Sequence, residues 1–182
     1  MATINRPIKV YNGSGWDYVY PQTMDSVFCI KTTADQISST YPGYNVSFNA
    51  AETGCSASNS YAVWGGEPSC EYTSSNRRAY IRKPGIYRII YDASVTAKNG
   101  ATDFFVQPIA YNAYNAENVY RELLSRQYFK ETNEYYNTVQ IVVTAKMSAG
   151  DYLPFMITRS TANNFRIASG HTKLTIIPVR ID

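Results

Sequence analysis

Apolar and polar residues alternate with a period of two along much of the second half of the chain. Residues 86–97 are the clearest example, with one face formed by Tyr87, Ile89, Tyr91, Ala93 and Val95. Similar strand-like segments are 77–82, 103–111, 138–147, 152–159 and 174–181. Turn signals separate them roughly every 8–15 residues, a spacing typical of β-sandwiches and barrels. The pattern predicts an all-β domain over residues 26–182.

The first 25 residues form a separate unit. Two short β-prone pieces, Ile8–Tyr11 and 16–20, flank Asn12-Gly13, and Asn-Gly between such pieces is a strong hairpin signal. Pro21 ends the second piece, because proline cannot donate to a strand ladder. An isolated hairpin is only marginally stable, so we expect this one to dock on the rest of the chain, a neighbouring copy or a larger assembly. The sequence therefore predicts a hairpin segment, 1–25, followed by one domain, 26–182.

Two regions are less regular. Residues 26–75 are rich in Ser, Thr, Asn, Gly and Ala, with short strand candidates at 26–32, 44–49 and 61–64. Residues 116–130 are compatible with a short helix or with a strand, because short apolar runs cannot be settled by their period. We favour the strand, since the neighbouring segments are all strands.

Composition narrows the class of protein. The chain has 17 Tyr against 7 Phe and 2 Trp, 17% charged residues and a formal net charge of +3. Abundant aromatic residues with little charge exclude a disordered chain, and the small net charge predicts no nucleic-acid partner. The sequence has no apolar run of 18 residues for membrane insertion, and its first residues lack the apolar segment of a secretory signal. We therefore expect synthesis in a cytoplasm.

The three cysteines are Cys29, Cys55 and Cys70, which are widely spaced and form no Cys-x-x-Cys pair. A bridge between Cys55 and Cys70 is compatible with their spacing. Buried thiols are the favoured interpretation in a cytoplasmic chain.

The sequence offers little catalytic or metal chemistry. His171 is the only histidine, and its position just before the last strand predicts an exposed or interface residue rather than a catalytic base. Because His and Cys do not cluster at zinc-ligand spacing, we expect no metal and no other cofactor. Calcium stays open through Asp92, Asp103 and Asp151, although Asp151 also fits a simple turn residue.

Two charged clusters have a structural interpretation. Glycan hydrolysis needs a pair of carboxylates, and the acidic candidates are Glu117, Glu122, Glu131 and Glu134. A small basic cluster comprises Arg77, Arg78, Arg82 and Lys83. We interpret the first as a solvated face and the second as a solvated strand end.

Tyrosine and asparagine crowd the region between residues 111 and 137. Tyrosine supplies rigid amphipathic contact area and asparagine supplies adaptable hydrogen bonds, a combination that suits a sugar. The candidate binding residues are Tyr111, Tyr114, Asn115, Tyr120, Tyr135 and Tyr136. The alternative is that these tyrosines pack against cross-strand neighbours.

Three motifs in order resemble the tumour-necrosis-factor-like jelly roll, which is shared with the globular heads of complement-type proteins. They are 79–97, where a Pro-Gly turn precedes an aromatic-rich strand, 138–160, which contains the turn Ala149-Gly150-Asp151, and the closing strand at 169–181. The resemblance covers about residues 44–182 and places the first strand of the fold at 46–52. It implies a jelly-roll β-sandwich that assembles as a homotrimer.

A second resemblance lies in residues 9–23, KVYNGSGWDYVYPQT. This piece is similar to a short module near the ends of bacteriophage tail, baseplate and head-fibre proteins. The matching residues, which the resemblance assigns to attachment to other virion proteins, are Tyr11, Asn12, Gly13, Trp16, Tyr20 and Pro21.

Some strands are apolar on both faces, and a large exposed apolar face needs a cover. The segment 152–157 is one example, and 176–179 is another. We therefore predict a trimer interface at Tyr152, Phe155 and Ile157. The alternative is that loops from residues 26–75 cover these strands.

These observations predict a trimeric jelly-roll fibre on a phage virion surface that binds a host-surface glycan. A first alternative is a head-fibre or capsid-decoration protein with an attachment or stabilising role. A second is a glycan hydrolase, and a third is a bacterial adhesin unrelated to phage.

Overall fold

The computed structural model describes residues 8–11, 14, 16–19, 28–38, 43–51, 70–97, 102–112, 120–123, 127–131, 136–160 and 165–182. Every regular element among these residues is a β-strand, so the predicted all-β class is confirmed. Within the same ranges there is no helix long and apolar enough to cross a membrane.

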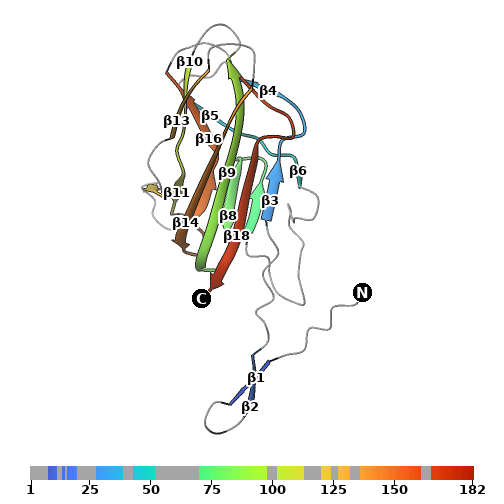
Figure 1. The fold of residues 1–182 in the computed structure, drawn as a ribbon, viewed down its shortest axis with the longest axis vertical. Helices are drawn as coiled ribbons and strands as arrows, with labels where there is room; N and C mark the ends of the chain where they lie inside the picture. Colours follow the sequence, from blue (N-terminus) through green and yellow to red (C-terminus); the bar gives the residue numbers. More distant parts are fainter. Residues whose placement is uncertain are drawn as a thin grey trace.

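One layer of the sandwich is a seven-stranded antiparallel sheet (Figure 1). Its order is β4 (Gln36–Ser38), β17 (Phe165–Ile167), β9 (Gly85–Ala97), β18 (Lys173–Ile181), β3 (Phe28–Lys31) and β6 (Ala50–Ala51), with β14 (Asn137–Met147) on the free side of β9. The long strand β9 pairs with β14 on one side and with β18 and β17 on the other. The sheet is therefore organised around the strand that showed the clearest alternation in the sequence.

The other layer is an antiparallel sheet in two halves, which we call the split sheet. One half is β13 (Gln127–Glu131), β10 (Thr102–Val106), β16 (Met156–Arg159) and β5 (Gly43–Asn45). The other half is β12 (Tyr120–Glu122), β11 (Ile109–Tyr111), β15 (Tyr152–Pro154), β8 (Arg78–Ile81) and β7 (Cys70–Thr73). Pro108 lies between β10 and β11, where the chain passes from one half to the other. Proline has no N–H for the ladder, so the strand is interrupted there.

The predicted N-terminal hairpin consists of β1 (Ile8–Tyr11) and β2 (Trp16–Val19), with Tyr11 opposite Trp16. In Figure 1 it lies apart from the sandwich. The other predicted attachment residues, Asn12, Gly13, Tyr20 and Pro21, lie outside the described residues.

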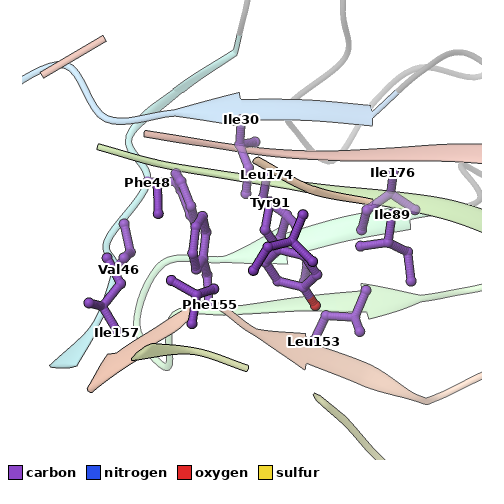
Figure 2. Packing of buried hydrophobic residues seen from close by; sticks show 14 of the residues in the cluster. Ile30, Val46, Phe48, Ile89, Tyr91, Leu153, Phe155, Ile157, Leu174 and Ile176 are labelled. Atoms are coloured by element: carbon purple, nitrogen blue, oxygen red, sulfur yellow. The ribbon is translucent and has the colours of Figure 1, made fainter. Parts of the chain in front are cut away.

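The core lies between the two sheets (Figure 2). The predicted inward face of β9 is confirmed, because all five of its predicted residues are buried. From the split sheet, Leu153 and Phe155 enter the same core, and the Phe155 ring packs edge-on against Tyr91 at 5.1 Å between centroids. Burial of such side chains contributes roughly 1.5–3 kcal/mol each, so this layer contact dominates the stability of the domain.

Several predicted elements can be compared with the described residues. The strand interpretation of 116–130 is confirmed where that segment is described, by β12 and the first part of β13. The predicted first strand at 46–52 is wrong for its first part. Val46 and Phe48 are buried without strand pairing, and only Ala50–Ala51 forms a short strand. The backbone here is held by core packing together with single hydrogen bonds, such as that from the Val46 N–H to the Phe155 carbonyl at 2.8 Å, rather than by a continuous ladder.

The cysteine prediction is tested in part. The thiols of Cys29 and Cys70 are buried, as favoured, and the Cys29 sulfur lies 3.1 Å from the hydroxyl oxygen of Thr175. Cys55 lies outside the described residues, as does the strand candidate 61–64.

The predicted trimer interface is wrong at Phe155 and Ile157. Both side chains are buried in the core of a single chain, with 1% and 0% exposure. The segment 152–157 is less two-sided than its composition indicates, because its inward positions are Leu153, Phe155 and Ile157. Tyr152 faces the opposite way and is covered by Tyr111 and Tyr80 on the split sheet.

Candidate functional site

Tyrosines from neighbouring strands form a row across the split sheet. The strand register places Tyr120, Tyr111, Tyr152, Tyr80 and Glu71 opposite one another on β12, β11, β15, β8 and β7. Residues directly opposite on adjacent strands share a face, so this row lies on one side of the sheet. We call Tyr111, Tyr152 and Tyr80 the tyrosine ladder.

Local alternation explains why the ladder faces away from the core. Ala79, Ile81 and Leu153 are fully buried between the layers. Their neighbours Tyr80 and Tyr152 must therefore point to the outer face, since successive side chains alternate along a strand.

The rings of the ladder are in contact. Tyr111 and Tyr152 are stacked, with centroids 5.1 Å apart and an interplanar angle of 6°. Tyr80 follows at 5.6 Å from Tyr152 with a tilt of 47°. The middle ring is covered from both sides and is only 6% exposed, and this burial raises the pKa of the Tyr152 hydroxyl. The Tyr152 phenol therefore stays neutral at physiological pH.

Two arginines border the ladder. The Arg78 guanidinium carbon lies 4.2 Å from the centroid of the Tyr152 ring, within the range of a cation–π contact. Arg82 lies over Tyr80 at 5.9 Å and forms an ion pair with Glu71. The charge of Arg82 is thus balanced within the site by a carboxylate.

The turn between β7 and β8 fixes one end of the ladder. The side-chain amide of Asn76 donates a hydrogen bond of 2.8 Å to the hydroxyl oxygen of Tyr80. Arg77 has a positive φ of 56°, a conformation that is unfavourable for a residue with a Cβ. Its guanidinium donates to the carbonyl of Asn45 at 2.9 Å and lies over the ring of Tyr44 at 5.0 Å. These contacts hold the turn in place despite its strained residue.

Of the predicted binding residues, Tyr111 and Tyr136 are described with their side chains, and they lie at different sheets. Tyr111 belongs to the ladder, and Tyr120 belongs to its row by backbone register. Tyr136 is 43% exposed and donates to Asp35 at 3.1 Å, next to β14 of the other sheet. The predicted residues Tyr114, Asn115 and Tyr135 lie outside the described residues.

Sequence reasoning missed most of the ladder. Tyr80 was not singled out, Tyr152 was assigned to a trimer interface, and Arg78 was interpreted as part of a solvated strand end. The available signal was the alternation of 78–82, where Arg, Tyr and Arg occupy one face while Ala79 and Ile81 occupy the other. That signal gives a polar and aromatic face but not the partner strands.

The aspartates considered for calcium are separated by their contacts. Asp92 accepts from Gln140 at 2.8 Å, Asp103 accepts from Tyr128 at 3.0 Å, and Asp151 accepts from the backbone N–H of Ser148 at 2.9 Å. The last contact makes Asp151 a turn residue, as considered from the sequence. Across the part of the chain that is described, three or more His, Cys, Asp or Glu residues do not gather at any metal-sized site.

The remaining catalytic candidates are described only in part. His171 is exposed in the turn before β18, which agrees with its prediction as an exposed residue. Glu117 and Glu134 lie outside the described residues, and Glu122 and Glu131 are described by their backbone alone.

Comparison with known proteins identifies the fold but no relative by sequence. No protein-family model and no curated protein matches this chain. Among solved structures, the chain is similar to Eiger TNF from S. frugiperda, with a TM-score of 0.55 and 12% identity over 85% of this chain and 94% of that one. It is also similar to murine APRIL, with a TM-score of 0.56 and 14% identity over 85% of this chain and 98% of that one. The fold is therefore a jelly roll like that of the tumour necrosis factors, as the motifs predicted.

Proposed function

We propose that the protein is a trimeric jelly-roll binding protein of a phage virion surface, which attaches to host carbohydrate through the tyrosine ladder. The observation that carries the proposal is the ladder itself, a row of stacked tyrosines on the outer face of the split sheet. Large exposed or half-exposed aromatic groups with polar tips are characteristic of binding surfaces.

The chemistry of the ladder suits a sugar. Phenol rings offer apolar surface to the C–H groups of a pyranose, and their hydroxyls exchange hydrogen bonds with its hydroxyls. Asn76 donates to the hydroxyl oxygen of Tyr80, so the Tyr80 proton stays available to a ligand. This arrangement supports binding rather than hydrolysis, since hydrolysis needs two carboxylates across the scissile bond.

The trimer is supported by the outer face of the seven-stranded sheet rather than by the residues first predicted. Val142 on β14 is 48% exposed and lies opposite half-buried Ile90, which lies opposite Thr175 on β18. Val179 on β18 is 57% exposed, and Ile177 beside it is half-buried. The argument from two-sided apolar strands therefore fails for 152–157, and the exposure of Val179 supports it for β18. A threefold contact would cover this face with the same face or edge of neighbouring copies.

The hairpin of residues 1–25 supplies attachment to the virion in this proposal. Its support is the resemblance of residues 9–23 to phage virion modules and the pairing of Tyr11 with Trp16 in a hairpin. We expect this hairpin to contact other virion proteins. Removal of residues 1–25 should release the domain from purified phage particles while the jelly roll stays folded.

Carbohydrate binding is tested on an oligosaccharide array with the full chain and two tyrosine variants. We expect wild type to retain a defined set of glycans and Tyr111→Ala to weaken their binding by about tenfold or more, since stacking on one aromatic side chain is worth roughly 1–3 kcal/mol. Tyr136→Ala is the matched control, because it removes an exposed tyrosine outside the ladder. Circular dichroism confirms that each variant is folded.

Two outcomes contradict the proposal. Equal binding by Tyr111→Ala and wild type would remove the ladder from the site. Absence of binding to any glycan, combined with stable incorporation into capsids, would instead favour the capsid-decoration role.

A further inference from the structure

We infer that the tyrosine ladder recognises a sugar that bears a carboxylate, with Arg78 as the residue that binds the anion. The inference rests on the proposed carbohydrate function and adds the chemical class of the ligand. It follows from how the positive charges around the ladder are used.

Three arginines lie in or beside the turn and strand that carry Tyr80, and two of them are already engaged with protein acceptors. Arg82 is paired with the carboxylate of Glu71, and the guanidinium of Arg77 donates to the carbonyl of Asn45. Arg78 lies on the outer face, with its guanidinium over the ring of Tyr152. Among the described residues, its guanidinium makes this aromatic contact but no ion pair or hydrogen bond with a protein acceptor.

The contact with Tyr152 prepares Arg78 for an anion. A cation–π contact uses the flat face of the guanidinium and leaves the N–H groups at its edge available to acceptors. Those donors match the two oxygens of a carboxylate in a bidentate pair. Because the ring of Tyr152 is itself stacked on Tyr111, the guanidinium rests on a surface that does not have to reorganise when the ligand binds.

The charges also give the ligand a direction. Glu71 stands at one end of the row and repels a second carboxylate, although Arg82 reduces this effect. An anion is therefore favoured at Arg78 over the middle ring, Tyr152, while the rest of the sugar lies along Tyr111 or toward the hydroxyl of Tyr80. The ladder contributes the apolar and hydroxyl contacts, and Arg78 contributes selection for acidic sugars.

The test is calorimetric titration of the full chain with uronic-acid oligosaccharides, each paired with its methyl-esterified form. The two forms present the same rings and differ in charge. We expect esterification to weaken binding by about tenfold or more, as for loss of a charge-assisted bidentate pair. Arg78→Lys should lose most of the preference for the acid, because an ammonium keeps the charge but not the paired donors.

Arg166→Gln is the control for net charge, since Arg166 is a half-buried arginine of β17 that pairs with Asp35 at 3.7 Å outside the ladder. We expect it to bind like wild type. Polyglutamate serves as a carboxylate probe without sugar rings, and we expect it to bind much more weakly than the uronates.

The outcomes separate this inference from the proposed function. If neutral and acidic forms bind equally and Arg78→Gln has no effect, the inference is overturned while carbohydrate binding stands. If polyglutamate binds as well as the uronates, the site is a general anion site and the inference is again overturned. If no sugar binds in either form, the proposed carbohydrate function fails together with the inference.

Discussion

Tyr87 and Tyr91 lie four positions apart on the inward face of β9, but among the described residues only the Tyr87 hydroxyl has an acceptor. Both side chains are fully buried. The hydroxyl of Tyr87 donates to the carbonyl of Lys83 at 2.7 Å. The hydroxyl of Tyr91 is buried with no hydrogen-bond partner among the described residues, and Figure 2 shows it within the cluster of apolar side chains. The same residue type on one strand therefore has opposite effects on stability.

Tyr91→Phe should stabilise the protein, and Tyr87→Phe should destabilise it. An unsatisfied buried polar group costs about 1–3 kcal/mol, whereas a satisfied hydrogen bond contributes about 1 kcal/mol. We expect the free energy of unfolding to rise by about 1 kcal/mol for the first variant and to fall by about the same amount for the second. Urea unfolding of both variants beside wild type measures the difference. A fall for Tyr91→Phe would mean that its hydroxyl has an acceptor.

The pKa of the Tyr91 hydroxyl predicts how stability depends on alkaline pH. Burial raises the folded-state pKa above the ordinary value of 10.0, so the folded state keeps the phenol neutral. Above pH 10 the unfolded state can ionise this group and the folded state cannot. The free energy of unfolding therefore keeps its full value below pH 10 and falls as the pH rises further.

Tyr91→Phe isolates this effect, because it removes the titrating group without removing the ring. The advantage of the variant over wild type in free energy of unfolding should be larger at pH 11 than at pH 8, measured by urea unfolding at both values. A constant difference would show that Tyr91 ionises equally in the two states.

Gly85 is predicted to be intolerant of any side chain. It begins β9, where it lies opposite Met147 and Ile181, and a Cβ there would overlap the carbonyl oxygen of Arg180. That oxygen belongs to the irregular stretch of β18 between Pro178 and Arg180, so relief requires a backbone shift. Gly85→Ala should reduce the free energy of unfolding by about 1–3 kcal/mol, the usual cost of overpacking.

Gly170→Ala is the contrasting variant. Gly170 has a positive φ of 71°, but a Cβ there would meet no atom within 4 Å. We expect a cost of about 1–2 kcal/mol from backbone conformation alone. Thermal unfolding of the two variants compares steric overlap with backbone strain. A lower melting temperature for Gly170→Ala than for Gly85→Ala would contradict the prediction that steric overlap at Gly85 costs more.

Val142→Lys should dissociate the proposed trimer. The change places a charge in the middle of the exposed face formed by β14, β9 and β18, where an interface would have to desolvate it. Light scattering should give three times 20.5 kDa for wild type and about one third of that mass for the variant. Tyr128→Lys is the matched control, since Tyr128 is 56% exposed on the split sheet. A monomeric wild type would overturn the trimer.

Local sequence patterns were sufficient for most individual strands. The alternation of β9 predicted its inward face correctly, and the turn around Gly150 and Asp151 was identified from its residue types. These features depend on residues close together in the chain. Pairing of strands that are distant in sequence is a different problem, because no local period records which strand lies beside which.

The candidate site depends on such pairing. Tyr80 and Tyr152 lie opposite each other although 72 positions separate them in the sequence. Crowding of tyrosines between 111 and 136 was therefore a poor guide, since it joined Tyr111 to Tyr136 and overlooked Tyr80. The assignment of Phe155 to an interface failed for a related reason, because composition does not state which face of a strand is covered.

The origin of the ladder in separate strands has a consequence for how its specificity can evolve. Each of its rings, and Arg78 beside them, is encoded in a different outward strand position, and the inward neighbours that hold the fold are separate residues. A single codon change can replace one ring or the guanidinium without altering a turn, a strand register or the core. The proposed recognition on this face can thus be retuned one position at a time, on a scaffold that does not have to change.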